Sequence, residues 1–474
     1  MLNNVKSRIF SGKKLYILLA MASLLFFVAC EDRSELTAPS APNTGSADFT
    51  RFVSIGNSLT AGYQSGSLYE SSQVFSFGKI IADQVGVSYE QPIISEPGIP
   101  GKLELHDLSP TILPNPGLGA PTNLSYEAPY NNLGIPGAIL WDLTDETDFT
   151  EKSNARENPY FEIVLRNQAL GKSIVEQALN LQPTFINLWI GNNDVLGYAT
   201  SGGTSGTDLT GLLPSNPNVF AFLYNAVAIA LTDTTGLRKI AAANIPDVQN
   251  IPYFTTIGPK IADALIDVME ANPAVVGLFY QQNGEAVASA FATPEQLIAG
   301  DVLLTLVASS YASLVGTPTG KFYREELDGV IPPGIDTTQA FGLHPQNPWP
   351  HPYILDADEI MITKDATTSF NDIIANTVNA NSETWVLVDI NEFFADVKAA
   401  ELATGGMIID GINFNTSFIL GNTFSLDGVH LTTQGYGVIA NEFISAINSK
   451  FGASIRTINV STLPGSIALG KVAL

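Results

Sequence analysis

Short apolar runs alternate along the chain with segments whose apolar residues recur at helical spacing. The runs are typical of buried strands and cover residues 51–56, 185–191, 239–246 and 384–391. Helical spacing is clearest over 75–86, 160–181 and 433–450. Gly452, just beyond the last of these segments, is a favoured helix stop. Strands that alternate with amphipathic helices predict an α/β fold, with a parallel sheet covered by helices on both faces.

Three other segments break this alternation. Residues 95–135 and 200–220 are rich in Pro, Gly, Asn and Ser, so we predict long loops there. Residues 302–315 form an apolar run of fourteen, which is short for a membrane span. That length favours a buried helix or a lid helix.

The N-terminus has a different pattern, typical of an export signal. Four basic residues precede the uncharged apolar run 15–29, and Cys30 follows at once. Residues 1–29 are therefore predicted to be a secretory signal peptide. The end of the run resembles the lipobox of bacterial lipoproteins, which implies that Cys30 carries lipid. A signal without lipidation, followed by a stray cysteine, is the alternative.

The cysteine count supports lipidation. Cys30 is the single cysteine of the chain, so an internal disulfide is excluded. Residues 30–48 are polar and rich in Pro, Ser, Ala and Thr, and are predicted to be a flexible tether. Glu31 and Asp32 resemble signals that direct some lipoproteins to the outer cell surface. We expect an exported outer-membrane lipoprotein that meets the membrane through its lipid anchor only, on the periplasmic or the surface side.

Charge excludes several partners. The formal net charge is −24, and removal of the signal, with its four basic and no acidic residues, makes it −28. So acidic a chain repels nucleic acid and anionic headgroups. The sequence also has no GxxxxGK[ST] motif for nucleotide phosphates.

Candidate chemistry lies in four short blocks. Ser58 follows the first predicted strand, and Asp427 precedes His430 by three residues. A serine nucleophile needs a base in hydrogen-bond reach, and the base needs an orienting partner. Asn193 ends a buried strand, and Gly137 lies in a Gly- and Pro-rich turn. Each block alone is also consistent with an ordinary turn.

Together the blocks resemble the SGNH, or GDSL, family of serine esterases and acylhydrolases. The matching segments, in family order, are Gly56-Asn57-Ser58-Leu59, Asn132 to Gly137, Gly191-Asn192-Asn193-Asp194 and Asp427 to His430. Asn57 stands where the family has Asp. The α/β-hydrolase motif G-x-S-x-G does not fit, because Thr60 occupies its last position.

The resemblance implies a role for each block. Ser58 would be the nucleophile, His430 the general base, and Asp427 the residue that orients His430. The oxyanion hole would consist of the Ser58 and Gly137 backbone N–H groups and the Asn193 side chain. The implied fold is a three-layer α/β/α sandwich with a mostly parallel, flavodoxin-like sheet. No metal or cofactor is implied.

The resemblance also defines the domain organisation. Residues 49–474 would form one hydrolase domain, with insertions at about 95–135, 197–235 and 247–383. His344 and His351 lie in a Pro-rich part of the last insertion, where a metal pair is an alternative to a structural loop. The segment 247–383 also carries aromatic residues that either line part of the substrate pocket or belong to the core: Phe254, Phe279, Tyr280, Phe322, Tyr323, Phe341, Trp349 and Tyr353.

The expected function is serine-dependent hydrolysis of carboxylic esters at the cell envelope, with lipid-like or other small-molecule esters as substrates. A carbohydrate O-acetyl esterase of the same fold is one alternative. A non-catalytic surface binding lipoprotein is another, and Asn57 is the feature that favours it.

Overall fold

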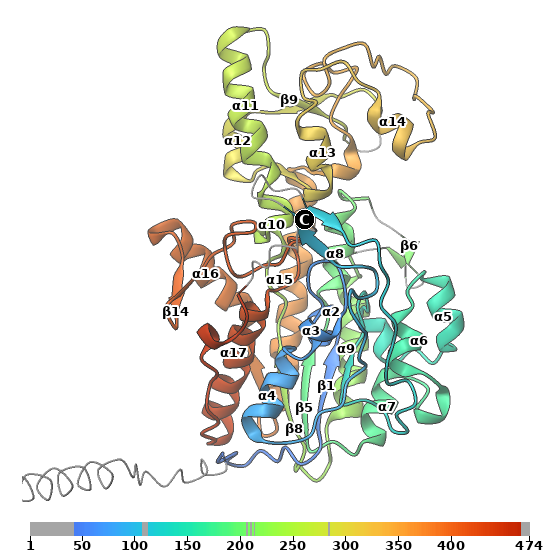
Figure 1. Ribbon diagram of the computed structural model, residues 1–474, viewed down its shortest axis with the longest axis vertical. Helices are drawn as coiled ribbons and strands as arrows, with labels where there is room; N and C mark the ends of the chain where they lie inside the picture. Colours follow the sequence, from blue (N-terminus) through green and yellow to red (C-terminus); the bar gives the residue numbers. More distant parts are fainter. Residues whose placement is uncertain are drawn as a thin grey trace, which may run out of the picture. The chain divides into compact units, whose positions relative to one another are not determined.

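The main sheet has five strands: β1 (Phe52–Gly56), β4 (Asn132–Gly134), β5 (Phe185–Trp189), β8 (Lys239–Ala243) and β13 (Trp385–Val388). They lie in the order β13-β8-β5-β1-β4 and all run parallel (Figure 1). The computed structural model describes residues 42–106, 112–204, 207–208, 211–212, 214–282 and 285–465.

Some predictions concern residues outside this description. The signal peptide 1–29, the lipidation site Cys30 and most of the predicted tether lie outside the described residues. Within the described part of the chain, no helix is both long enough and apolar enough to cross a membrane.

The strands that the apolar runs predict are confirmed. β1 and β5 are buried over their whole length, as expected for the centre of a parallel sheet. The edge strand β4 was not predicted, because it has three residues and lies in the segment 95–135 that composition marks as loop. The same segment contains a small hairpin of β2 (Leu103–Leu105) and β3 (Ile112–Pro114).

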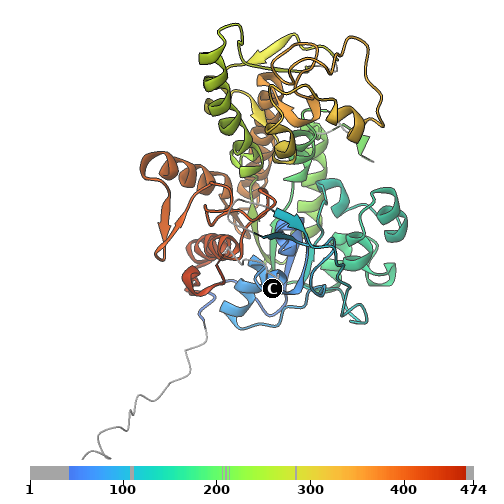
Figure 2. The same cartoon turned by 45° about the horizontal axis from the view of Figure 1, so that its top comes forward.

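Two groups of helices pack against the sheet. The first contains α4 (Phe77–Val85) and α17 (Thr433–Phe451), where the rings of Phe77 and Phe443 stack with centroids 4.7 Å apart. The second contains α7 (Ile174–Asn180), α9 (Pro217–Leu231) and α15 (Ala357–Ala380). Figures 1 and 2 show these helices around the sheet. The protein is therefore an α/β protein, and the arrangement is compatible with a three-layer sandwich.

Capping residues explain where two of these helices begin and end. The Ser76 hydroxyl accepts the backbone N–H of Lys79 at the start of α4, and Gly86 ends that helix at φ +75°. At α17 the Thr432 hydroxyl accepts the N–H of Gly435 at 2.9 Å, and Gly452 ends the helix at φ +65°. Both helices agree with the prediction.

The helix predicted over 160–181 is wrong as a single helix. The structure has α6 (Tyr160–Leu165), a 3-10 turn (Gln168–Leu170) and α7. The break follows from Arg166, which takes a left-handed φ of +62° while its guanidinium donates to the carbonyl groups of Tyr126 and Ala128. These tertiary contacts outweigh the local helical spacing.

Two of the predicted insertions contain helices that belong to the main core. α9 lies within 197–235, and α15 lies within 247–383. The rings of Phe220 on α9 and Phe370 on α15 stack with centroids 4.0 Å apart, and both side chains are fully buried. The segment outside the main core is therefore shorter than predicted.

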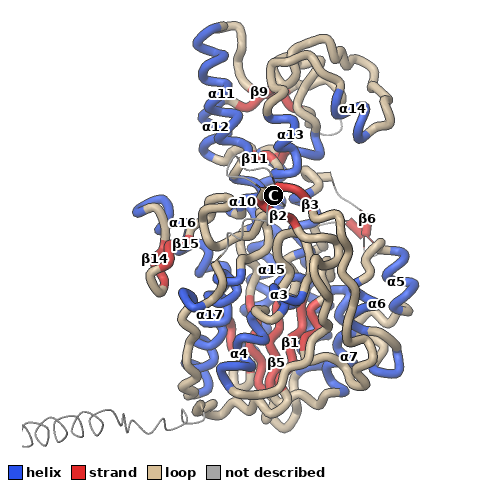
Figure 3. The backbone as a smooth tube through the Cα atoms, viewed as in Figure 1, coloured by secondary structure: helices blue, strands red, loops and turns tan. Residues whose placement is uncertain are grey.

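That segment has a hydrophobic core of its own, which includes residues from Ile257 to Ile354. Its longest helix is α11 (Ile257–Ala271), which packs on α12 (Pro294–Ala299). Figure 3 shows that much of the remainder is loop. The helix predicted over 302–315 is wrong: the run forms β11 (Leu303–Leu304), a 3-10 turn (Leu306–Ala308) and α13 (Ser309–Ala312). The side chains of Leu304, Ala308 and Tyr311 help to fill this second core.

Candidate active site

Ser58 lies at the carboxyl edge of the sheet. It is the first residue of the short helix α2 (Ser58–Ala61), which follows β1 directly. Asn193 begins α8 (Asn193–Thr200) after the neighbouring strand β5. Both side chains are thus positioned by adjacent parallel strands, at the edge where ligands bind in open α/β sheets.

A chain of hydrogen bonds joins Ser58, His430 and Asp427. The Nε2 atom of His430 lies 2.9 Å from the Ser58 Oγ atom, and its Nδ1 atom lies 3.0 Å from Asp427 Oδ2. The structure therefore brings together the serine, the base and the orienting carboxylate that the sequence analysis singled out, although most of the chain lies between Ser58 and His430.

Asp427 is held by several donors. Its Oδ1 accepts the backbone N–H groups of Val429 at 2.9 Å and His430 at 2.8 Å, while its Oδ2 accepts that of Gly66 at 2.7 Å. Burial alone would raise the pKa of the Asp427 carboxyl, but the His430 ring and the N–H groups of His430 and Val429 hold that pKa below its ordinary value. The carboxylate is ionised and fixed, as an orienting group requires.

The loop that carries Asp427 and His430 depends on Gly428. This glycine has φ +72°, and its carbonyl accepts the N–H of Tyr253 at 2.9 Å. A Cβ atom at residue 428 would lie 2.9 Å from that same nitrogen. The loop thus packs directly against α10 (Pro252–Thr255), and only glycine fits this close approach.

Tyr63 is a site residue that sequence reasoning missed. Its ring lies against the His430 ring with centroids 4.6 Å apart, and its hydroxyl donates to the carbonyl of Gly66 at 2.5 Å. Nothing in the spacing of the sequence indicates this contact, because it depends on how the 58–66 turn meets the loop before α17.

Both the oxygen and the nitrogen of the Asn57 side-chain amide make hydrogen bonds. Its Oδ1 accepts the N–H of Leu59 at 3.1 Å and caps α2, while its Nδ2 donates to Asn192 Oδ1 at 3.1 Å. The residue is buried. Asparagine at position 57 therefore supports the turn before Ser58. Nothing in its contacts indicates that the site has been lost.

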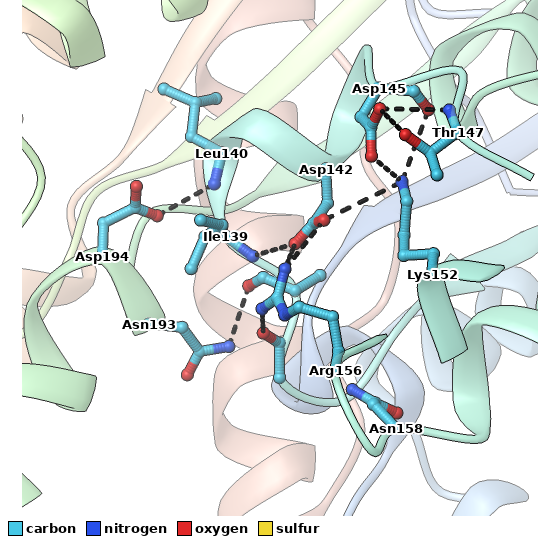
Figure 4. A network of polar contacts seen from close by, with 12 residues as sticks. Ile139, Leu140, Asp142, Asp145, Thr147, Lys152, Arg156, Asn158, Asn193 and Asp194 are labelled. Carbon is cyan, nitrogen blue, oxygen red and sulfur yellow. Dashed lines mark hydrogen bonds and ion pairs between the residues drawn. The ribbon is translucent and has the colours of Figure 1, made fainter. Parts of the chain in front are cut away.

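Three hydrogen-bond donors follow the carboxyl ends of the neighbouring strands β1, β4 and β5. Among the residues that the structure describes, the backbone N–H groups of Ser58 and Gly137 have no hydrogen-bond acceptor. Asn193 donates one hydrogen of its Nδ2 group to the carbonyl of Ala138 at 2.8 Å (Figure 4). An amide nitrogen carries two hydrogens, so the second remains for a ligand.

Gly137 is sterically required as well. Its φ is +79°, and a Cβ atom there would lie 2.9 Å from Asn158 Nδ2. A side chain at this position would disturb both the backbone conformation and the Asn158 contact.

A cleft lies beside Ser58 and His430. Its apolar lining includes Leu196, Val248, Ile251, Phe394, Phe424 and Val429. None of the eight aromatic residues of 247–383 lines this cleft, which favours the alternative that they belong to a core. Most of them fill the second core instead, because the segment must bury its own apolar surface.

The Pro-rich loop offers no assembled metal site. His351 Nε2 lies 2.9 Å from Glu359 Oε1, and His344 Nδ1 accepts the N–H of Gln346 at 3.2 Å. The described residues contain no cluster of three or more His, Cys, Asp or Glu side chains that could hold a metal ion. Both histidines have structural contacts here.

Comparison of the sequence with models of protein families finds no match, and comparison with curated proteins finds none either. The case for a function therefore rests on the geometry of the site and on the resemblance of its four motifs.

Proposed function

We propose that this protein is a serine esterase of the SGNH type. The observation that carries the proposal is the hydrogen-bond chain from Ser58 through His430 to Asp427 at the mouth of an apolar cleft. A nucleophile, a base and an orienting carboxylate in this order are the parts that acyl transfer needs.

The strand order supports the proposal. Numbered along the chain, the five strands lie in the order 2-1-3-4-5, which is the flavodoxin-like arrangement expected for the SGNH fold. The switch point of that order lies between β1 and β5, where Ser58 and Asn193 follow their strands. Ligands bind at such switch points.

In the first half of the proposed reaction, the Ser58 oxygen attacks the carbonyl carbon of the ester while His430 takes the serine proton. Negative charge grows on the carbonyl oxygen. The N–H groups of Ser58 and Gly137 and the second hydrogen of Asn193 Nδ2 are the donors for this charge. The intermediate then collapses, His430 protonates the leaving alcohol, and an acyl-enzyme remains.

In the second half, water takes the place of the alcohol. His430 removes a proton from the water, whose oxygen attacks the acyl carbon, and the same donors hold the oxyanion. Ser58 leaves with the proton from His430, and the carboxylic acid is released. Asp427 keeps the ring oriented in both halves and stabilises its charged form.

The cleft lining favours esters with an apolar acyl group over acetylated sugars. Each buried methylene contributes up to ~0.8 kcal/mol, or roughly fourfold in kcat/KM. The test is a series of aryl esters from acetate to decanoate, with acetylated sugars beside them. Rising values to butyrate or beyond support the proposal. A sharp maximum at acetate, with rapid turnover of acetylated sugars, would favour the carbohydrate O-acetyl esterase.

The decisive experiment for catalysis compares Ser58→Ala with wild type. We expect a loss of about 10⁶ in kcat, as for other triad serines, and loss of covalent labelling by a fluorophosphonate. Ser72→Ala, which removes the hydroxyl of another buried serine in a short helix, is the matched control and should retain both. Activity of Ser58→Ala within tenfold of wild type would refute the assignment, and a wild type inert to every ester would favour the binding lipoprotein.

We also propose that Cys30 carries the lipid anchor, which rests on the sequence alone. Metabolic labelling with a fatty acid tests it: the wild type should incorporate label and Cys30→Ser should not. Equal labelling of the two proteins would contradict lipidation at this residue.

A further inference from the structure

Side chains bind five of the nine backbone polar groups of residues 136–140. The carbonyl of Pro136 accepts Asn158 Nδ2 at 2.7 Å, that of Gly137 accepts Arg156 Nη2 at 3.3 Å, and that of Ala138 accepts Asn193 Nδ2 at 2.8 Å. On the donor side, the N–H of Ile139 is bound by Asp142 and the N–H of Leu140 by Asp194, both at 2.9 Å. So many side-chain contacts to one short loop fix the orientation of its peptide groups.

The contact of Asn158 acts on the peptide that carries the Gly137 N–H. The Pro136 carbonyl and the Gly137 N–H belong to one planar peptide group and point in opposite directions. A donor at the carbonyl oxygen therefore fixes the direction of the N–H on the other side. The same hydrogen bond also polarises the peptide and makes its N–H a better donor.

Arg156 fixes the next peptide and is itself held in place. Its Nη1 atom lies 3.1 Å from both carboxylate oxygens of Asp142, and Asp142 in turn binds the N–H of Ile139. Lys152 completes the group, with its Nζ atom 2.6 Å from Asp145 and 3.9 Å from Asp142. Figure 4 shows these side chains gathered beside the segment Ile139–Leu140.

This charged group is buried. The side chains of Asp142 and Lys152 are each 1% exposed, and that of Arg156 is 14% exposed. Two cations and two carboxylates face one another, so the group is neutral as a whole. Buried ion pairs contribute little net stability compared with apolar residues, because desolvation offsets their attraction. Their effect here is to define one geometry for the loop.

From these contacts we infer that Asn158 and Arg156 are positioning residues, which aim the Gly137 N–H at the oxyanion of the reaction. The inference rests on the proposed esterase function. Neither residue lines the cleft beside Ser58; each acts through the Pro136–Gly137–Ala138 backbone.

The experiment compares Asn158→Ala and Arg156→Gln with wild type on an aryl ester, with active protein counted by fluorophosphonate titration. We expect kcat to fall about tenfold in each variant, with KM changed less than twofold. Loss of a whole oxyanion donor lowers kcat by more, about 10²–10³. The effect expected here is smaller because the Gly137 N–H is misdirected in these variants but is still present. Arg156→Lys keeps the charge and should recover part of the loss.

A second measurement tests the oxyanion directly. A trifluoromethyl ketone forms a tetrahedral adduct whose oxygen mimics the oxyanion, so its inhibition constant should rise by the same factor as kcat/KM falls.

Asn448→Ala is the matched control. Asn448 Nδ2 donates to the carbonyl of Ile455 at 2.8 Å and its Oδ1 accepts the N–H of that residue, the same kind of contacts that Asn158 makes. It lies near the far end of α17. Its loss should lower the melting temperature and leave kcat and the inhibition constant unchanged.

Wild-type kcat in both Asn158→Ala and Arg156→Gln, or effects that follow only the melting temperature, would overturn the inference. So would a fall in kcat with no change in ketone affinity. These outcomes differ from failure of the proposed function, in which the wild type itself is inactive or retains its activity after Ser58→Ala.

Discussion

The amide of Asn57 makes two hydrogen bonds of opposite kind, and an aspartate can make only one of them unaided. Its oxygen caps α2 through the Leu59 N–H, and its nitrogen donates to Asn192. In Asn57→Asp the cap persists, and Asn192 can turn its own amide to donate in return. We expect kcat/KM within about threefold of wild type.

Asn57→Ala is the contrasting variant, because it removes both bonds. We expect it to lower the free energy of unfolding by about 1 kcal/mol, the usual cost of a lost cap, and to reduce kcat as the turn at Ser58 loosens. Chemical denaturation and aryl ester kinetics measure the two effects. If Asn57→Asp is as damaging as Asn57→Ala, Asn192 does not compensate.

Gly137 gives a second prediction at the residue scale. Gly137→Ala places a Cβ 2.9 Å from Asn158 Nδ2 at a φ of +79°, so the loop or Asn158 must shift. We expect kcat to fall by about 10–100-fold with little change in KM, since the donor acts on developing charge. Gly236→Ala is the control: its φ is +70° and nothing lies within 4 Å of the added carbon. A normal kcat in Gly137→Ala would argue against the N–H as an oxyanion donor.

At the scale of elements, α9 and α15 are helices of the main core that lie on either side of the second core in the sequence. Each lies in a segment that composition marks as inserted, and each packs within the main core. The stacked rings of Phe220 and Phe370 join the two helices. The second hydrophobic core, from Ile257 to Ile354, lies between them in sequence.

Phe370→Ala tests the contribution of this helix pair. Removing a fully buried phenylalanine should cost about 3–5 kcal/mol in the free energy of unfolding, because it opens a cavity between α9 and α15. Met361→Ala, at an exposed position of the same helix, should cost little. Equal effects of the two changes in denaturant titrations would show that α15 is not part of the cooperative core.

At the scale of the whole molecule, the proposed site couples pH to the stability of the fold through the Asp427 carboxyl.

Asp427 links pH to stability. Its pKa in the folded protein is lower than the ordinary value of about 3.9, so the unfolded chain binds its proton more readily. The stabilisation is therefore complete above pH 4 and is lost as pH falls through the folded pKa, by about 1.4 kcal/mol for each pH unit that separates the folded and unfolded pKa values. Wild type and Asp427→Asn should differ in free energy of unfolding most above pH 4, and a difference that grows toward lower pH would contradict this.

The sequence by itself determined the parts of the fold that local patterns encode. Buried runs specify β1, β5, β8 and β13, and helical spacing with capping residues specifies α4 and α17. Motifs likewise singled out Ser58, Asn193, Asp427 and His430 as a set. These signals are local because strand and helix periodicity, caps and tight turns each depend on a few neighbouring residues.

The tertiary structure decided what depends on distant parts of the chain. It broke the predicted helix at Arg166, whose guanidinium binds carbonyl groups about forty residues away. It placed most of the aromatic residues of 247–383 in a second core, and it brought Tyr63 to the His430 ring and Asn158 and Arg156 to the loop around Gly137. The physical reason is the same in each case: a side chain's partners are set by the order of strands and the packing of layers, and no short window of sequence contains that information.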